Sequence, residues 1–237
     1  MHDDTHHDRV SGVLRLVSTP IGHLDDLSPR ARQALETADL IACEDTRRTG
    51  QLLARLGVKR RMLSMHDHNE RQRVPLIIET LEEGQNVAVV SDAGTPLLSD
   101  PGFPLVREAA ARGIRVEPVP GPSAILAALA VSALPPYPFT FAGFPPPRVK
   151  RRRTFFRQYG QLGHTIVLFE SPHRLITSLS DARHELGDRP AAVCRELTKM
   201  HEEILRGTLG ELHAELSNRP SLKGEFAVVI GPPPKGS

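Results

Sequence analysis

Short apolar, β-branched segments alternate with helix-forming segments along the first half of the chain, and this alternation strongly restricts the possible folds. The clearest strand, residues 86–90, runs into a loop rich in glycine and proline at residues 91–102. A helix with proline in its first turn is predicted to follow at residues 103–111. Strands that alternate with helices form largely parallel sheets, because parallel neighbours need a long crossover connection. The sequence therefore predicts an α/β domain.

The same alternation extends on both sides of that loop. Strands are predicted at 13–17, 40–43, 61–65 and 114–119, and helices at 30–37, 49–56, 70–83 and 124–133. A proline-rich stretch then changes the composition, and we place a domain boundary near Pro138. Further strands at 139–142, 165–169, 191–194, 203–206 and 226–230, with a helix ending near Leu186, predict a second α/β domain over 139–237. The first domain would span residues 13–138.

Composition excludes several classes of protein. The formal net charge of +2 is too small to indicate nucleic-acid binding by itself. No apolar run reaches the roughly 18 residues that a membrane span needs. Residues 1–9 lack the apolar core of a signal peptide, so we predict a disordered tail at 1–12 and a cytoplasmic location. The two cysteines, Cys43 and Cys194, fall on different predicted strands, and neither a disulfide nor a metal site is expected.

Loops that follow the predicted strands are the candidate binding elements. They are residues 18–22, 44–48, 91–102 and 120–123, joined in the second half by 170–174 and 195–199. In a parallel sheet the carboxyl ends of all strands lie at one edge, so these loops would gather there. The loop at 91–102 carries neither the GxGxxG nor the GxxxxGK(S/T) phosphate-binding motif, so a ligand there would not be held by its phosphates. Asp92 can accept hydrogen bonds from an ammonium or a hydroxyl, whereas Asp100 is interpreted as a turn or helix cap.

Taken in order, these loops resemble those of one family, the bacterial small-subunit ribosomal RNA (cytidine-2′-O)-methyltransferases. That family lies within the tetrapyrrole-methylase fold group of S-adenosylmethionine enzymes. The matching motifs are Thr19-Pro20-Ile21-Gly22, Cys43-Glu44-Asp45-Thr46-Arg47, Ser91-Asp92-Ala93-Gly94-Thr95-Pro96, Ser99-Asp100-Pro101-Gly102, Pro120-Gly121-Pro122-Ser123-Ala124, Gly143-Phe144-Pro145-Pro146, Ser171-Pro172-His173-Arg174 and Arg195-Glu196-Leu197-Thr198-Lys199. The resemblance covers residues 13–230. One departure is His23, where the family usually has asparagine.

The resemblance implies a two-domain, class III methyltransferase fold with S-adenosylmethionine in a cleft between the domains. It also implies a homodimer that methylates a cytidine ribose in 16S ribosomal RNA or the 30S subunit. The methyl donor has no phosphate, which agrees with the missing phosphate motifs. The residues that would hold it are Pro20, Ser91, Asp92, Ala93, Gly94, Thr95, Pro96, Gly121, Pro122, Ser123 and Ala124.

The acceptor side of the reaction is predicted from charge and position. The loop at 44–47 follows a strand and carries both signs of charge, so we place it beside the acceptor ribose. The catalytic candidates are Glu44, Asp45, Arg47 and Lys199. Glu44, Asp45, His23 and Lys199 are all candidate general bases, Lys199 only if burial lowers its pKa. The sequence does not choose among them.

Basic residues cluster although the whole chain is nearly neutral. The densest run supplies the predicted RNA-binding residues Arg148, Lys150, Arg151, Arg152 and Arg153, and a second group contains Arg55, Lys59, Arg60 and Arg61. Two other functions remain open at this point. One is an enzyme of the same fold that methylates a small molecule such as a tetrapyrrole precursor. The other is a non-catalytic protein that binds RNA or nucleotides.

Overall fold

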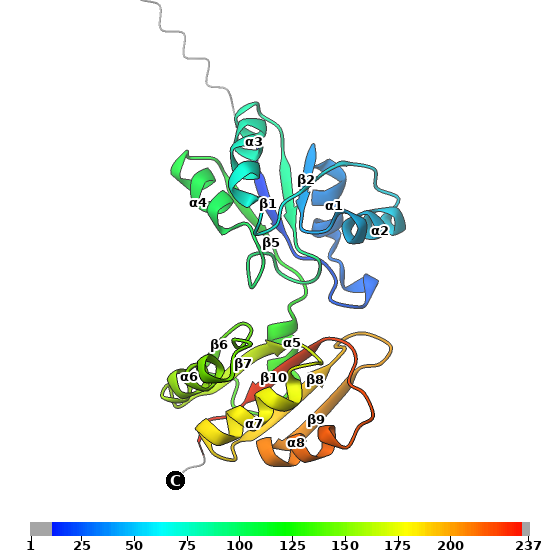
Figure 1. Cartoon of the computed structure of the whole chain (residues 1–237). Coiled ribbons are helices and arrows are strands. Elements are labelled where there is room, and N and C mark those ends of the chain that lie inside the picture. The colour runs from blue at the N-terminus through cyan, green and yellow to red at the C-terminus, as the bar shows by residue number, and fades with distance from the viewer. Residues whose placement is uncertain (1–10, 234–237) are drawn as a thin grey trace, which may run out of the picture. The chain divides into compact units, whose positions relative to one another are not determined.

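The computed structural model describes residues 11–233, and these residues divide into two compact units (Figure 1). The first unit contains residues 11–20 and Leu24–Pro122, and the second contains Ile21–His23 and residues 123–233. The predicted tail at 1–12 lies outside the described residues except at its end. There Gly12 is buried, and its backbone N–H donates to the Leu81 carbonyl at 2.8 Å.

The first unit is a five-stranded sheet in the order β3-β2-β4-β1-β5, and every recorded pairing is parallel, as the alternation predicts. Its strands are β1 (Leu14–Val17), β2 (Leu40–Cys43), β3 (Arg61–Ser64), β4 (Val87–Val90) and β5 (Val116–Val119). Its helices are α1 (Pro29–Thr37), α2 (Thr46–Leu56), α3 (Glu70–Glu82) and α4 (Phe103–Ala111), with a 3₁₀ turn at η1 (Leu24–Asp26).

Helices cover both faces of this sheet (Figure 1). Val17 packs with Leu35 of α1 and Leu53 of α2 on one face. On the other face Leu14 packs with residues of α3 and α4, including Leu105. Because successive residues of a strand point to opposite faces, strands β2 and β4, which are covered on both faces, are apolar at every position rather than alternating, whereas β1 carries Arg15, paired with Glu117 of β5.

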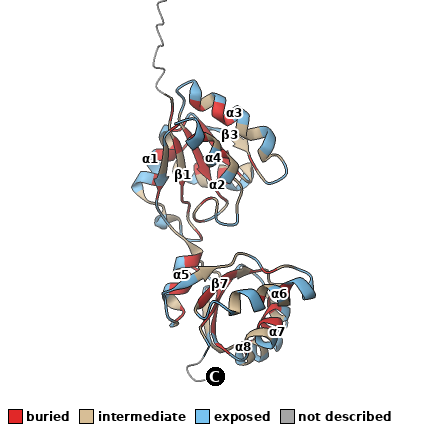
Figure 2. Cartoon of the chain, turned by 90° about the vertical axis from the view of Figure 1, so that its left-hand side faces the viewer, coloured by how far each residue is buried: buried red, intermediate tan, exposed pale blue. Residues whose placement is uncertain are grey.

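The second unit has a mixed sheet in the order β6-β7-β10-β8-β9. Its strands are β6 (Phe139–Phe141), β7 (Thr165–Glu170), β8 (Pro190–Arg195), β9 (Glu203–Thr208) and β10 (Phe226–Ile230), and only the β6–β7 pairing is parallel. Helices α6 (Val149–Gly160), α7 (Leu175–Leu186) and α8 (Leu209–Ser217) cover one face, and α5 (Ala124–Val131) lies on the other (Figures 1 and 2).

Helix α5 explains why the units divide before Ser123 rather than near the predicted boundary at Pro138. Its buried residues Ile125, Ala128 and Leu129 pack in one cluster with Val167 and Val229 of the second sheet. The proline-rich stretch therefore lies inside the second unit. The short segment Ile21–His23 belongs to the same unit, because Ile21 is buried in this apolar cluster.

Two helices of the second unit were not predicted. Helix α6 carries the basic run predicted to bind RNA, and α8 begins with a capping box formed by Thr208 and Glu211. Helix α2 also begins earlier than predicted, at Thr46, because the Asp45 carboxylate caps it. Within residues 11–233 no helix combines the length and the apolar character needed to cross a membrane.

Candidate functional site

Three loops meet where the neighbouring strands β4, β1 and β5 of the first unit end. Thr19 and Gly94 form an antiparallel bridge, with N–H to oxygen distances of 2.9 and 3.0 Å. The Ser18 hydroxyl donates to Thr95 Oγ1 at 3.3 Å, and the Thr95 hydroxyl donates to the Pro122 carbonyl at 3.3 Å. The structure thus joins the predicted donor-binding loops into one hydrogen-bonded element.

Close backbone approach holds the same loops together. A Cβ atom on Gly121 would lie 2.9 Å from Ser18 Cβ, so only glycine fits there without displacement. The buried Ser91 hydroxyl donates to the Ala93 and Gly94 carbonyls at 3.2 and 3.4 Å, which closes the turn after β4. Of the remaining predicted residues, Pro20 lies in the loop after β1, and Asp92 and Pro96 lie in the loop after β4. Ser123 instead caps α5 by accepting from the Leu126 N–H at 3.5 Å, just before Ala124.

Asp92 connects the donor loops to the start of α2. Its Oδ1 accepts from the Asp45 backbone N–H at 3.3 Å, and its Oδ2 is 3.2 Å from Arg48 Nη1. The Asp92 side chain is 23% exposed, which leaves part of the carboxylate accessible. A carboxylate has about four lone-pair sites, so these two contacts do not fill it. Asp92 therefore both orients the loop after β2 and keeps capacity for a ligand.

Asp45 and Arg47 form a local structure at the α2 N-terminus. Asp45 caps the helix by accepting from the Arg47 N–H at 2.8 Å, and it also binds the Arg47 guanidinium at 2.9 Å. These bonds hold the Asp45 pKa at about 2, well below its ordinary value. A carboxylate with so low a pKa is a weak proton acceptor near neutral pH. Asp45 is thus better suited to position α2 than to remove a proton.

Glu44 has the opposite environment. Burial is the largest effect that raises its pKa, and the charges of Asp92 and Asp67 raise it further, partly offset by Arg48 and His66. An acid whose pKa moves toward neutrality becomes a stronger base at working pH. Among the carboxylates of this loop, Glu44 is the one suited to accept a proton. Asp67, which follows β3, contributes to this tuning and was missed in the sequence, where it was one residue of a polar run.

Lys199 does not meet the condition under which it could act as a base. Burial alone would lower its pKa, but hydrogen bonds to Glu225 and Glu196 outweigh burial and raise the pKa. The distances from the Lys199 amine to these carboxylates are 2.9 and 3.0 Å. A Cβ on Gly22 would lie 2.5 Å from Lys199 Cγ, so the lysine packs against the segment Ile21–His23 of the second unit. Its position indicates a structural role.

Of the two roles expected for Asp100, turn or helix cap, the structure excludes the cap of α4 and leaves Asp100 in the loop before it. The N-cap is Gly102 at φ 123°, and its N–H donates to Glu70 Oε1 at 2.6 Å, so the acceptor comes from another helix. Asp100 is half-buried, and burial together with the charge of Glu44 raises its pKa to about 6, against a hydrogen bond with Ser91 that lowers it.

The raised pKa of Asp100 predicts how stability changes with pH. The folded protein keeps the Asp100 proton to about pH 6, whereas the unfolded chain releases it near the ordinary value of 3.8. Ionisation therefore lowers the stability of the wild type as pH rises through this window. We expect the free energy of unfolding of wild type relative to Asp100→Asn to fall between about pH 4 and pH 6 and then stay level, measured by urea denaturation. A difference that rises over this interval would contradict the assignment.

The predicted RNA-binding residues separate into two groups. Lys150 and Arg151, in the first turn of α6, are exposed, as is Arg148 just before it. Arg152 is buried, with its side chain 4% exposed and 2.7 Å from the Asp181 carboxylate. Arg153 binds the other Asp181 oxygen at 2.7 Å. Arg152 is thus engaged inside the unit and is not available to a phosphate. The second basic group, Arg55, Lys59, Arg60 and Arg61, is exposed on the first unit.

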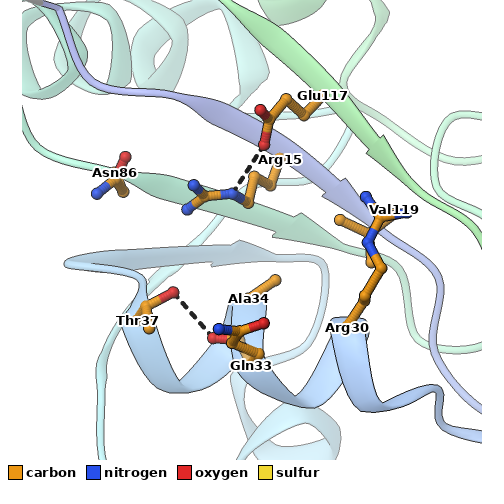
Figure 3. A pocket seen from close by; sticks show the side chains of 8 residues that line it. All are labelled: Arg15, Arg30, Gln33, Ala34, Thr37, Asn86, Glu117 and Val119. Carbon is orange, nitrogen blue, oxygen red and sulfur yellow. Dashed lines mark hydrogen bonds and ion pairs between the residues drawn. The ribbon is translucent and has the colours of Figure 1, made fainter.

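A cavity of about 410 Å³ lies between α1 and strands β1 and β5 (Figure 3). Its lining includes Arg15, which donates to Glu117 Oε2 at 3.1 Å across the two strands, and the helix residues Arg30 and Gln33. None of the predicted donor-binding residues lines it. Within the described part of the chain, no group of three or more histidine, cysteine, aspartate or glutamate residues is arranged to hold a metal ion.

Comparison with known proteins places this fold and site in a class. The model of the tetrapyrrole (corrin/porphyrin) methylase family matches residues 13–213, and the chain belongs to that family. Among solved structures, the uroporphyrin-III C-methyl transferase of Thermus thermophilus complexed with S-adenosylhomocysteine has a TM-score of 0.65 at 18% identity. The match covers 93% of this chain and 97% of that one, and it shows the shared fold.

Relatives with higher sequence identity show which group within the tetrapyrrole methylase family the chain belongs to. The ribosomal RNA small subunit methyltransferase I of Xylella fastidiosa is 49% identical over 221 residues, which is 92% of this chain and 81% of the relative. The protein of the same name from Thermotoga maritima is 44% identical over 219 residues, 92% of this chain and 98% of the relative. Within the tetrapyrrole methylases, the chain belongs with the ribosomal RNA small subunit methyltransferases I. The resemblance inferred from the loop motifs is confirmed, and the protein is a methyltransferase.

Proposed function

We propose that the protein transfers a methyl group from S-adenosylmethionine to the 2′-hydroxyl of a cytidine ribose in small-subunit ribosomal RNA. The observation that carries this proposal is the interlocked set of loops that follow β1, β4 and β5, with Glu44 beside them after β2. The relatives that share 40–49% of residues are named for ribosomal RNA, whereas the structures named for uroporphyrin-III share about a fifth of residues. This difference favours RNA over a tetrapyrrole as acceptor.

The loop residues fit the methyl donor. Gly121 is exposed and brings its backbone to the surface of the element without a covering side chain, whereas Gly94 is buried, and its φ of 84° allows the turn in which its backbone pairs with Thr19. The partly exposed Asp92 carboxylate offers an acceptor for an ammonium or a ribose hydroxyl. S-adenosylmethionine, when bound, supplies a methyl group on a positively charged sulfur. The protein contributes alignment, which can be worth about 7–11 kcal/mol when the reacting atoms are well placed.

Glu44 is our candidate for the proton acceptor. The ribose oxygen forms a bond to the methyl carbon as the carbon–sulfur bond breaks, and Glu44 takes the hydroxyl proton. Its raised pKa suits this step, whereas the low pKa of Asp45 and the ion-paired Lys199 do not. Arg47 is 86% exposed beyond its bond to Asp45, so its guanidinium can reach a phosphate of the substrate.

Gly121 provides a test of donor binding. A Cβ at this position would collide with Ser18, so we expect Gly121→Ala to weaken binding of S-adenosylhomocysteine at least tenfold by isothermal titration calorimetry. The matched control is Gly50→Ala in α2, where the nearest atom would be 3.6 Å from the new Cβ. Equal affinity for S-adenosylhomocysteine in the Gly121 variant and the control would show that this loop does not bind the methyl donor.

The proposed reaction is tested by incubating the protein with S-adenosylmethionine labelled in its methyl group. Three acceptors are compared: 30S subunits, isolated 16S ribosomal RNA and a tetrapyrrole precursor. We expect label in the RNA and none in the tetrapyrrole. Label only in the tetrapyrrole would support the small-molecule enzyme, and label in no acceptor would contradict the proposed activity.

The resemblance also implies a homodimer in the cytoplasm, and both remain part of the proposal. A mass measured by light scattering during size-exclusion chromatography tests the first. A value near twice the 26.1 kDa of one chain is expected, and a value for one chain would contradict it.

A further inference from the structure

The loop between β6 and α6 is held by two arginines from inside the second unit. The Arg174 guanidinium donates to the Pro145 carbonyl at 3.0 Å, and the Arg152 guanidinium donates to the Pro147 carbonyl at 3.0 Å. The loop is also joined to β7, because the Phe169 N–H donates to the Gly143 carbonyl at 3.0 Å. Residues 143–147 are therefore fixed at three alternate carbonyls, those of Gly143, Pro145 and Pro147.

Each of these arginines is itself oriented by a buried carboxylate. Arg174 Nη2 lies 2.8 Å from Glu170 Oε1, and the Glu170 side chain is fully buried. Glu170 also accepts from the Ser171 N–H and the Ser178 hydroxyl. Arg152 binds Asp181, whose side chain is 7% exposed. Two ion pairs with buried carboxylates thus hold one short surface loop in place. Burying these charges costs free energy, which would be unusual for a connection without a role.

The loop presents one aromatic side chain to solvent. Phe144 is 51% exposed, although the carbonyls of its neighbours Gly143 and Pro145 are hydrogen-bonded and Pro145 is buried. One side of its ring rests on Phe169, with ring centroids 5.6 Å apart and planes inclined by 56°. The ring is therefore supported from within the unit while part of it remains accessible. A supported aromatic ring loses little entropy when a flat ligand binds to it.

Exposed positive charge follows the ring closely along the chain. Arg148, Lys150 and Arg151 are all exposed where the loop enters α6. Arg152 and Arg153, the other basic residues of this run, are paired with Asp181. An aromatic ring beside unneutralised cations is the combination by which proteins bind single-stranded nucleic acid, the ring stacking on a base and the cations contacting phosphates.

We propose that Phe144 stacks on an unpaired base of the RNA substrate, and that Arg148, Lys150 and Arg151 contact the phosphates beside that base. This inference rests on the proposed RNA-methylating function and adds the chemistry by which the second unit recognises RNA. The base must be unpaired, because the faces of bases inside an A-form helix are stacked on each other. Glu170 and Asp181 act as positioning residues, since they reach the RNA only through the arginines that hold the loop.

The test uses the full chain and a single-stranded, cytidine-rich RNA of about ten nucleotides that carries one 2-aminopurine. The fluorescence of 2-aminopurine falls when it stacks, so the signal reports stacking as well as binding. We expect Phe144→Ala to weaken binding by about 5- to 150-fold and to lose the quenching, and Phe144→Tyr to keep both. Phe144→Leu retains an apolar side chain and should still lose the quenching.

Leu162→Ala is the matched control, because Leu162 is an apolar residue in the turn just after α6, and it is 47% exposed. It should bind RNA as the wild type does, and melting temperatures of all variants establish that they are folded. Unchanged affinity and quenching in Phe144→Ala would overturn the inference, as would a wild type that does not bind this RNA. Methylation of 30S subunits by the wild type is measured separately, so failure of the proposed function is distinguished from failure of the stacking site.

Discussion

Replacing Glu44 by glutamine is expected to slow methyl transfer by about 10²- to 10⁴-fold, the range that general-base catalysis contributes. Glutamine keeps the shape of the side chain but cannot accept the ribose proton. Binding of S-adenosylhomocysteine should be unchanged, because the donor loops are held by Ser18, Thr19 and Thr95 rather than by Glu44. Single-turnover methylation of RNA with labelled S-adenosylmethionine measures the rate.

Asp67→Asn is the matched control for Glu44. The negative charge of Asp67 raises the pKa of Glu44, so its removal should move the acidic limb of the pH–rate profile to lower pH. The rate on the plateau should stay close to that of the wild type, because Asp67 is not the proton acceptor. A Glu44→Gln variant with the wild-type rate, or an Asp67→Asn profile that moves to higher pH, would contradict the role of Glu44.

Replacing Asp181 by alanine is expected to lower the free energy of unfolding by about 3–5 kcal/mol, measured by urea denaturation. The reason is that the Arg152 side chain, 4% exposed, would keep its positive charge inside the unit without a partner. Arg153 is 40% exposed and can turn toward water, so it adds little to the loss. The double variant Arg152→Met with Asp181→Leu should regain most of the stability, because it removes both charges and fills the space.

Glu185→Ala is the corresponding control, four residues further along α7. Its partner Arg157 is 62% exposed and remains hydrated when the carboxylate is removed. The loss of stability should be clearly smaller than for Asp181→Ala. Equal losses in the two variants would show that burial of Arg152 is not the source of the effect.

Much of the first unit could be predicted from the sequence, because strands β2 and β4 are buried on both faces and are apolar at every position. Residues 40–43 and 87–90 are such segments, and each was recognised as a strand. The meeting of the loops at 18–20, 91–96 and 120–122 follows from the rule that parallel strands end at one edge. The order of the strands in the sheet, in which β1 lies between β4 and β5, depends on topology. The periodicity of apolar residues in the sequence does not reveal this order.

The features that could not be predicted depend on contacts between distant residues. The run at 148–153 has the composition of a solvated basic surface, and only its pairing with Asp181 places Arg152 inside the unit. The same limit applies to Asp92, whose bonds to Asp45 and Arg48 join segments that are far apart in the chain. Helix α5 was recognised, but its membership of the second unit depends on the packing of Ala128 and Leu129 in the core of that unit.

The most direct test of the central claim locates the transferred methyl group. Ribosomal RNA labelled by the protein is hydrolysed with alkali, which cannot cleave the chain after a nucleotide whose 2′-oxygen is methylated. The account predicts that the label is recovered in an alkali-resistant dinucleotide that begins with cytidine. Label recovered in single nucleotides would show that the methyl group is on a base, and it would contradict transfer to the ribose 2′-hydroxyl.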